Sequence, residues 1–373
     1  MTEVSIFALQ PSLEGIQTAR VIVAAQDPGA AQFLGPVLPH LAEETSLQTI
    51  VISAGHATEY LNNFPGIELE PLGNPKADAF ETAASLEPTL IVAGTSAQPE
   101  VRTGLAQTFP DAPLVVAEDY YVAAGDILER ALAGEMRMPD RIFAMDKFAK
   151  QELVRRYGHA IVDLASRIAI TGQPAFDYLA DTDAIKRERE AVRKVLELDE
   201  SAILISCFTT IGATGLAGAL ANELGGTQAS FSLAFNKHPR DPANMAAYLE
   251  RFRQAGVTVH NTEGLSSRQL IAAADLVAVL PYSTLSLHAI RHGIPTVHVG
   301  TDPNSLGASQ VPVVRGASPY ASPAEFWPLA QKLLDPTHPT ARALHRQMER
   351  LYPVDGGSAA RVAASICKLA RAA

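Results

Sequence analysis

The sequence of 373 residues predicts an α/β fold of two Rossmann-like domains, each built on a parallel sheet, which face each other across a cleft. This length is more than one hydrophobic core usually organises. Short, continuous apolar runs alternate with helical patterns along the chain, and such runs are typical of parallel strands covered on both faces. A charge-rich stretch, 178–201, interrupts the alternation once, so we expect a domain boundary beside it.

The first domain, residues 1–178, contains seven candidate strands, separated by segments in which apolar residues recur every three or four positions. The strands are 20–26, 47–55, 67–72, 89–94, 114–120, 141–146 and 167–172. Strand–helix alternation at this spacing is typical of a parallel sheet with helices wound over both faces.

The second domain, residues 179–350, repeats the pattern with candidate strands 202–208, 229–236, 257–261, 276–283, 295–300 and 311–316. From residue 338 onward the pattern is helical, interrupted by Pro353, Gly356 and Gly357. We expect residues 351–373 to form a C-terminal helix that packs back on the first domain. Open parallel sheets bind ligands at the carboxyl ends of their strands, so the cleft is the expected active site.

Composition excludes several classes of protein. The formal net charge is −10 and no run of Lys or Arg forms a basic stripe, so we expect no nucleic-acid partner. Cys207 and Cys367 are too few for a disulfide framework, and the histidine spacings match no metal motif, so we expect no metal and a cytoplasmic location. The most apolar stretch, 270–280, is too short to be a transmembrane segment. Peripheral membrane contact stays open.

The tripeptide Lys237-His238-Pro239 follows a candidate strand of the second domain. A Lys and a His at a strand end, beside the amide groups of a following helix, can hold a phosphate, with Pro239 fixing the turn. The same residues also suit a solvated surface loop, and the tripeptide alone does not separate these two interpretations.

Hydroxyl residues follow two other strands of this domain. Ser283 and Thr284 stand between a strand and a helix, where they can cap the helix or bind a phosphate. Thr209 and Thr210 occupy the comparable place after the first strand of the domain. The sequence therefore predicts a phosphate-binding edge, with helix capping as the structural alternative.

Two candidate catalytic carboxylates lie in the first domain. Glu118 and Asp119 come at the end of the strand 114–120. A carboxylate in a partly dry cleft can act as a general base, because burial raises its pKa toward neutrality. The structural alternative is that Asp119 caps a loop while Glu118 is solvated.

Three more strand ends of the first domain are candidates for the same cleft. Asp27 and Gly29 stand between a strand and a helix; Gly29 permits close approach of a ligand, and Asp27 can alternatively cap the helix. Thr95 and Ser96 follow another strand, and Gly172 comes where the chain leaves the domain.

The stretch 236–300, from Asn-Lys-His-Pro-Arg through a Ser-Thr pair to Gly-Ile-Pro and a last strand, resembles the nucleotide-binding half of GT-B-fold proteins. Similar arrangements occur in bacterial sialyltransferase-like enzymes, Kdo transferases, CDP-glycerol glycerophosphotransferases and, with changes, non-hydrolysing UDP-GlcNAc 2-epimerases. This resemblance implies a GT-B fold in which His238, Ser283 and Thr284 contact the phosphate of a nucleotide donor.

The first domain resembles these families more loosely. Glu118 and Asp119 match an acidic pair of the sialyltransferase-like enzymes, in which one carboxylate takes the proton of the acceptor hydroxyl. Tyr120 replaces the glycine that follows the pair there. The segment 171–174 is similar to a strand-end motif that precedes the crossing between domains, which implies that Gly172 is a hinge.

We therefore expect a glycosyltransferase that moves a sugar from a nucleotide-activated donor, with a CMP-activated acid sugar among the candidates, to a sugar or lipid-linked acceptor hydroxyl in polysaccharide biosynthesis. The expected reaction is inverting and metal-independent, with no cofactor besides the donor. One alternative is a nucleotide-sugar 2-epimerase, whose Gly-Gly and Glu-Glu elements are replaced here by Ser283-Thr284 and Ser286-Leu287-His288. The other alternative is a non-catalytic ligand-binding protein. The oligomeric state is left open.

Overall fold

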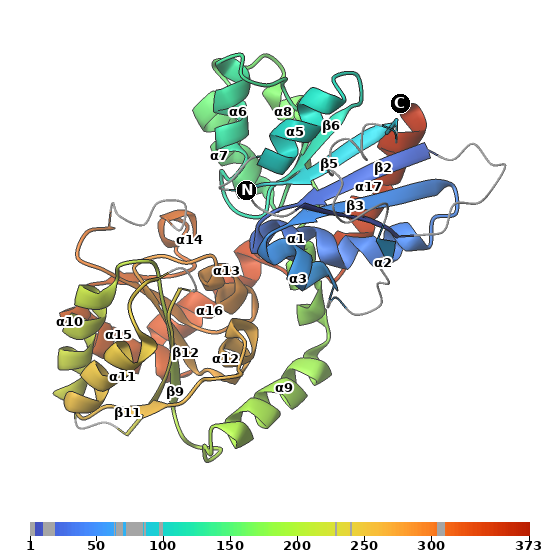
Figure 1. Ribbon diagram of the computed structural model, residues 1–373. Coiled ribbons are helices and arrows are strands. Elements are labelled where there is room, and N and C mark those ends of the chain that lie inside the picture. Colours follow the sequence, from blue (N-terminus) through green and yellow to red (C-terminus); the bar gives the residue numbers. More distant parts are fainter. Residues whose placement is uncertain are drawn as a thin grey trace. The chain divides into compact units, whose positions relative to one another are not determined.

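The computed structural model describes residues 4–9, 19–62, 64, 70–71, 85, 87–96, 100–227, 230–238, 241–303 and 310–373. The chain divides into two compact units (Figure 1). Unit 1 comprises Met1–Asp177 and Asp355–Ala373, and unit 2 comprises Tyr178–Val354. The predicted α/β class is confirmed for each unit taken by itself.

The sheet of unit 1 has the strand order β4-β1-β3-β2-β5-β6-β7-β8. Its strands are β1 (Val4–Ala8), β2 (Ala19–Ala25), β3 (Leu47–Ala54), β4 (Glu70–Pro71), β5 (Leu90–Gly94), β6 (Leu114–Ala117), β7 (Arg141–Ala144) and β8 (Ile168–Ile170). From β3 to β8 all neighbours are parallel, whereas β1 pairs antiparallel with both β3 and β4. The parallel part therefore brings the carboxyl ends of β2, β5 and β6 to one edge.

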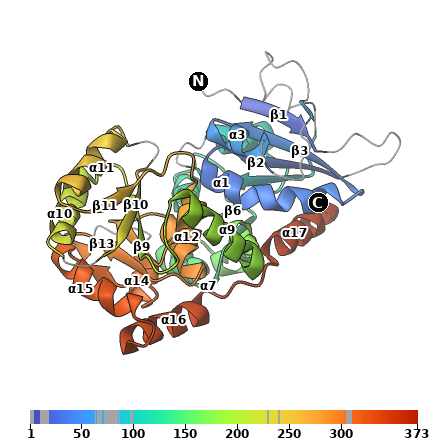
Figure 2. The same ribbon diagram turned by 90° about the horizontal axis from the view of Figure 1, so that it is seen from below.

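The helices of unit 1 cover this sheet. They are α1 (Pro28–Leu34), η1 (Gly35–Val37), α2 (Leu38–Ala42), α3 (His56–Asn62), α5 (Glu100–Thr108), α6 (Gly125–Leu132), α7 (Lys147–Tyr157), α8 (Leu164–Arg167) and α17 (Ser358–Ala372), with η2 (Pro174–Ala180) at the boundary between the units. Helix α17 packs on α2, η1 and β2, and Figure 2 shows it along the sheet. It places Val362, Ile366 and Cys367 in the same core cluster as Val21 and Val23 of β2. A segment from the far end of the sequence thus completes the core of unit 1.

Unit 2 contains a six-stranded parallel sheet in the order β11-β10-β9-β12-β13-β14. Its strands are β9 (Leu204–Thr209), β10 (Ser232–Asn236), β11 (Thr258–His260), β12 (Leu276–Leu280), β13 (Thr296–Val299) and β14 (Tyr320–Ala321). Counted along the unit, this is the doubly wound order 3-2-1-4-5-6, which reverses direction between β9 and β12. Ligands of such sheets bind at this reversal, beyond the carboxyl ends of the two strands.

The helices of unit 2 are α9 (Thr182–Val195), α10 (Thr214–Gly225), α11 (Met245–Gln254), α12 (Ser267–Ala273), α13 (Leu285–Arg291), α14 (Gln310–Val314), α15 (Pro323–Leu334) and α16 (Pro339–Leu351). Among the described residues, no helix combines the length and apolar character that a membrane crossing requires.

Helix α9 contains most of the charge-rich stretch, and it is tied to the sheet of unit 2. Arg189 Nη2 lies 2.6 Å from Asp275 Oδ1, and Arg193 Nη1 lies 3.2 Å from Asp275 Oδ2. Asp275 Oδ2 also accepts the N–H of Leu204, at the start of β9, at 2.8 Å. One carboxylate therefore fixes both the helix and the first strand of the unit.

One strand prediction is wrong. The run 311–316 is not a strand, because Gln310–Val314 form helix α14. The sheet is extended instead by β14, whose Tyr320 pairs with His298 of β13. A short apolar run has no periodicity that separates a strand from a helix, and its three valines favoured the strand. Strand β1 was not predicted, and of the predicted strand 67–72 the structure describes only β4.

Candidate active site

A pocket of about 340 Å³ lies at the carboxyl ends of β2, β5 and β6 in unit 1. We call it the acidic pocket, because three of its lining side chains are carboxylates. Its lining residues are Asp27, Thr95, Ser96, Asp119, Val122, Ala123 and Asp126. It brings together residues predicted from three separate strand ends, and it adds Asp126, which the sequence did not single out.

The carboxylate of Asp119 is held closely in this pocket. Thr95 donates its hydroxyl to Asp119 Oδ1, and the N–H of Asp119 lies 3.3 Å from Thr95 Oγ1. On the other side, the backbone of Gly29 comes so near that an added Cβ would overlap Asp119 Oδ2. The sequence predicted that Gly29 permits the close approach of a ligand. In the structure, the group that lies close to Gly29 is the carboxylate of Asp119. Any larger residue at position 29 would push the carboxylate aside.

The surroundings of Asp119 favour its neutral form more than water does. Burial raises its pKa from 3.8 to about 6, and the charge of Asp27 acts in the same direction. The hydrogen bond from Thr95 opposes this by stabilising the carboxylate. A carboxylate with a pKa near 6 is ionised at neutral pH and is more basic than an ordinary Asp, which suits proton abstraction.

Glu118 precedes Asp119 but has a different environment. Its side chain is fully buried and is not among the residues that line the acidic pocket. Its Oε1 accepts the N–H of Ala124 at 3.3 Å, and its Oε2 has no partner among the described residues. Burial raises the pKa of Glu118 well above its ordinary value; the hydrogen bond from Ala124 opposes this, and the charges of Asp119 and Asp146 act in the same direction as burial. Within the acidic pair, only Asp119 reaches the pocket.

A buried arginine supports the third carboxylate of the pocket. Arg102 is 2% exposed, and its Nη2 lies 3.0 Å from Asp126 Oδ2. Burial lowers the pKa of Arg102, and the pairing with Asp126 partly restores it. Asp27 is the N-cap residue of helix α1 without a side-chain capping hydrogen bond, and it is one of the residues that line the pocket.

The segment after β8 also touches Asp119, through a residue that the sequence did not single out. Gln173 is 5% exposed, and its Nε2 donates to the backbone oxygen of Asp119 at 2.7 Å. Its neighbour Gly172 has φ +91° and lies against Ser358 and Arg361 of helix α17 rather than in the acidic pocket. The sequence gives no signal for Gln173, because an amide side chain beside a Pro is an ordinary feature of a loop. Its connection to the pocket is visible only in the folded chain, as the hydrogen bond to Asp119.

In unit 2, the predicted hydroxyl residues lie at the reversal of the sheet. Thr209 ends β9 and is buried, and the N–H of Thr210 donates to Leu280 O, at the end of β12, at 2.8 Å. Ser283 Oγ accepts the N–H of Leu285 at 3.2 Å, which caps α13. Thr284 is exposed, stands at the N-cap position and makes no side-chain capping bond. The structure therefore brings these four residues to adjacent strand ends.

Lys237 and His238 follow β10, whereas Pro239 lies outside the described residues. Lys237 Nζ donates to Asp241 O at 2.8 Å. The carboxylate of Asp241 accepts hydrogen bonds from Gly212 N–H (3.2 Å), Ala243 N–H (2.9 Å) and Tyr248 OH (2.8 Å). The hydrogen bond from Ala243 is the main reason that the pKa of Asp241 is lowered. Asp241, which the sequence did not indicate, thus joins the loops that follow β9 and β10.

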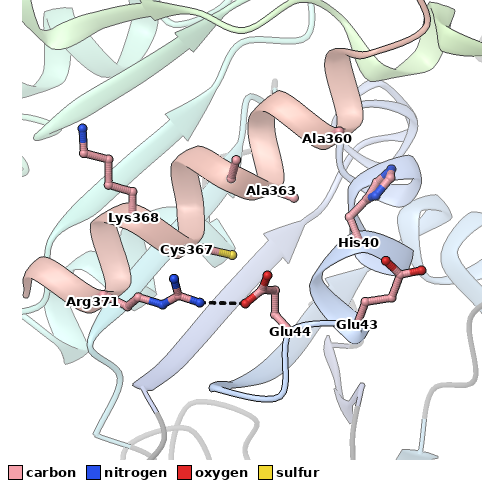
Figure 3. Close-up of a pocket in the computed structure, with 9 residues that line it drawn as sticks. His40, Glu43, Glu44, Ala360, Ala363, Cys367, Lys368 and Arg371 are labelled. Atoms are coloured by element: carbon pink, nitrogen blue, oxygen red, sulfur yellow. Dashed lines mark hydrogen bonds and ion pairs between the residues drawn. The ribbon is translucent and has the colours of Figure 1, made fainter.

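A second cavity in unit 1, of about 480 Å³, lies between α2 and α17 (Figure 3). Arg371 Nη2 lies 2.7 Å from Glu44 Oε2 and donates to Ser46 Oγ at 2.9 Å. Cys367 lines this cavity and is buried, and burial raises the pKa of its thiol. The ion pair of Arg371 and Glu44 ties the C-terminal part of α17 to the segment that follows α2. Across the described residues, no three or more His, Cys, Asp or Glu side chains are grouped as metal ligands.

Comparison with solved structures defines the class of this architecture. The chain is similar to a UDP-GlcNAc 2-epimerase from Neisseria meningitidis bound to UDP-GlcNAc, with 11% identity, 94% of this chain and 100% of the other covered, and a TM-score of 0.66. It is also similar to a glycosyltransferase from Rickettsia africae, with 12% identity, 95% and 99% covered, and a TM-score of 0.60. The wall teichoic acid polymerase TagF, in a structure with CDPG, gives 12% identity, 96% and 91% covered, and a TM-score of 0.57.

The protein therefore has the GT-B fold, as its sequence resemblance implied. No protein-family model matches the sequence, and no curated protein matches it either. The similarity lies in the fold, while the chemistry must be argued from the residues of the site.

Proposed function

We propose that the protein is a metal-independent, inverting glycosyltransferase that uses a nucleotide-activated sugar, with Asp119 as the general base. The observation that carries the proposal is the carboxylate of Asp119, which combines a pKa of about 6 with a place in the lining of a pocket. The neighbouring protein structures support the donor class, since they include a glycosyltransferase and an epimerase bound to UDP-GlcNAc.

The proposed reaction is a single displacement at the anomeric carbon. Asp119 takes the proton of an acceptor hydroxyl, whose oxygen forms a bond to that carbon as the bond to the donor phosphate breaks. The electron pair of the broken bond leaves with the nucleotide. Because the acceptor attacks from the side opposite the leaving group, the anomeric configuration inverts.

Unit 2 is the proposed nucleotide site. The reversal of its sheet lies between β9 and β12, where Thr210 and Ser283 present polar groups. The loop at Gly212 leads into the 12-residue helix α10, whose first amide groups can stabilise charge on the departing phosphate. Lys237 and His238, after the next strand, extend this polar edge.

Calorimetric titration with CMP, UDP, CDP and GDP tests the donor class. We expect one of these nucleotides to bind, and binding of none would contradict the proposal. Donor turnover with a panel of sugar and lipid-linked acceptors then tests the transfer itself.

The variant Asp119→Asn tests the assigned base. We expect turnover to fall about 10²–10⁴-fold, because a positioned general base contributes on that order. Nucleotide affinity should stay unchanged, because Asp119 belongs to unit 1. The matched control is Asp111→Asn, which alters an exposed carboxylate of the same unit and should leave turnover intact. Equal activity in both variants would assign the base elsewhere.

A nucleotide-sugar 2-epimerase is the second candidate, favoured by one observation. The acidic pocket presents three carboxylates, and inversion of a carbon centre requires one group to remove a proton and another to return it. Conversion of UDP-GlcNAc in the absence of any acceptor would decide for the epimerase over the transferase.

A further inference from the structure

The segment in which the chain leaves unit 1 is held at both ends by helix α17. At its start, Arg361 Nε donates to Thr171 O at 2.9 Å. Near its end, the carboxylate of Asp177 accepts the N–H of Ser358 at 3.1 Å and that of Ala359 at 2.7 Å. The chain leaves unit 1 after Asp177 and returns to it at Asp355. These hydrogen bonds therefore join the outgoing segment to the returning one within unit 1.

Gln173 lies inside this held segment and connects it to the acidic pocket. Its amide nitrogen donates to the backbone oxygen of Asp119 at 2.7 Å, and its side chain is almost fully buried. We propose that Gln173 is a positioning residue, which fixes the peptide plane of Asp119 and thereby the direction in which the carboxylate enters the pocket. The inference rests on the role proposed above for Asp119.

Three contacts then define the place of Asp119. Thr95 binds its carboxylate and its N–H, and Gly29 leaves just enough room for Oδ2. The peptide group that follows Asp119 contains the N–H of Tyr120, whose hydrogen bond to the carboxylate lowers the pKa of Asp119. Neither Thr95 nor Gly29 holds that peptide group in place. Gln173 supplies that restraint from a different strand end, so its loss should let the carboxylate turn toward water.

A neutral amide is suited to this position because it donates a hydrogen bond without adding a charge beside Asp119. A Lys there would place a cation beside Asp119 and lower the pKa of the carboxyl, which would weaken the base. An ionised Glu has no proton to donate to the backbone oxygen of Asp119. Gln173 donates one hydrogen bond while it leaves the electrostatics of the carboxylate to burial and to Asp27.

The test uses Gln173→Met in the full chain, since Met has a similar length and no N–H group. Titration of the Asp119 carboxyl by ¹³C NMR should show its pKa falling from about 6 toward 3.8, because the carboxylate gains solvent. In the transfer assay, kcat should fall about tenfold or more while KM for the donor stays constant. The matched control is Gln48→Met, because Gln48 Oε1 accepts from Arg20 Nε at 3.0 Å at the opposite end of the strands.

An unchanged pKa of Asp119 in a folded Gln173→Met variant would overturn the inference, as would an equal shift in Gln48→Met. If the Met variant does not fold, Gln173→Asn decides on the same criterion, because Asn keeps the amide but is one methylene too short to reach. The NMR titration does not depend on turnover. Absence of transfer by the wild-type protein would thus reject the proposed function, while the titration still decides the role of Gln173.

Discussion

Glu118 and Asp119 carry the same functional group one residue apart, yet the turn after β6 gives them opposite environments. Glu118 is fully buried and does not line the acidic pocket, whereas Asp119 lines it beside Thr95. The sequence left open which of them is the base. In our proposal Asp119 is the base. Consecutive side chains at the end of a strand leave the backbone on opposite sides, and of these two only the side chain of Asp119 lines the acidic pocket.

The pH dependence of transfer should report the carboxyl of Asp119. Its pKa in the folded protein, about 6, lies above the ordinary 3.8, so protonation inactivates the base as the pH falls through about 6. We therefore expect kcat/KM to decline on the acid side with a midpoint near pH 6. The measurement is the pH profile of kcat/KM, and a midpoint near pH 4 would show that the base is an unperturbed carboxylate.

Gly29→Ala should disturb the acidic pocket through a single methyl group. The new Cβ would occupy the place of Asp119 Oδ2, so the carboxylate must move. We expect a loss of transfer activity of about 10²-fold, on the order caused by displacements of about 1 Å at a reacting group. Steady-state kinetics measures this loss.

The control for this change is Gly226→Ala at the C-terminal end of helix α10, where an added Cβ makes only ordinary contacts, the nearest at 3.6 Å. That variant should keep its activity and gain up to about 1 kcal/mol in the free energy of unfolding, because Ala in a compatible backbone conformation restricts the unfolded chain. Full activity in Gly29→Ala would show that Asp119 tolerates displacement.

At the scale of elements, the strands were predictable where both faces of the sheet are covered. The runs that form β5 and β12 are continuously apolar and buried at every position, as expected for strands with both faces covered. Helix α14 was not predictable, since five residues do not show a period. Among site residues, Asp119, Gly29 and Thr95 follow strands and could be found by position. Gln173, Arg102 and Asp126 act through contacts that only the folded chain brings together.

Helix α17 should contribute strongly to the stability of unit 1. Ile366 is completely buried in the cluster that includes Val21 and Val23 of β2. Ile366→Ala should therefore lower the free energy of unfolding by about 2–5 kcal/mol, as measured by urea denaturation. As a control, Val195→Ala removes methyl groups from a side chain that is 65% exposed and should cost much less. Similar losses in both variants would contradict the assigned packing.

At the scale of the whole molecule, the two units have separate tasks in our proposal. A nucleotide that binds unit 2 should slow amide hydrogen exchange at the loops after β9 and β12, because binding stabilises the conformation that holds the ligand. The pocket loop 118–124 should keep its exchange rate when the nucleotide is added without a sugar. Hydrogen exchange measured by mass spectrometry tests this assignment of nucleotide binding to unit 2. Protection confined to unit 1 would place the nucleotide in unit 1 instead. The expected cleft between the domains stays a prediction.

The order in which the chain is synthesised gives the position of α17 a further meaning. Unit 2 lies within unit 1 along the sequence, so its residues have all emerged from the ribosome once residue 354 is free. Unit 1 begins first but closes last, because its core lacks Val362 and Ile366 until α17 has been made. Domains usually fold from the N-terminus during translation, and we expect that order to be inverted here. The segment that carries Gln173 is also secured only then, so in our proposal a nascent chain could bind a nucleotide with unit 2 before its acidic pocket is complete.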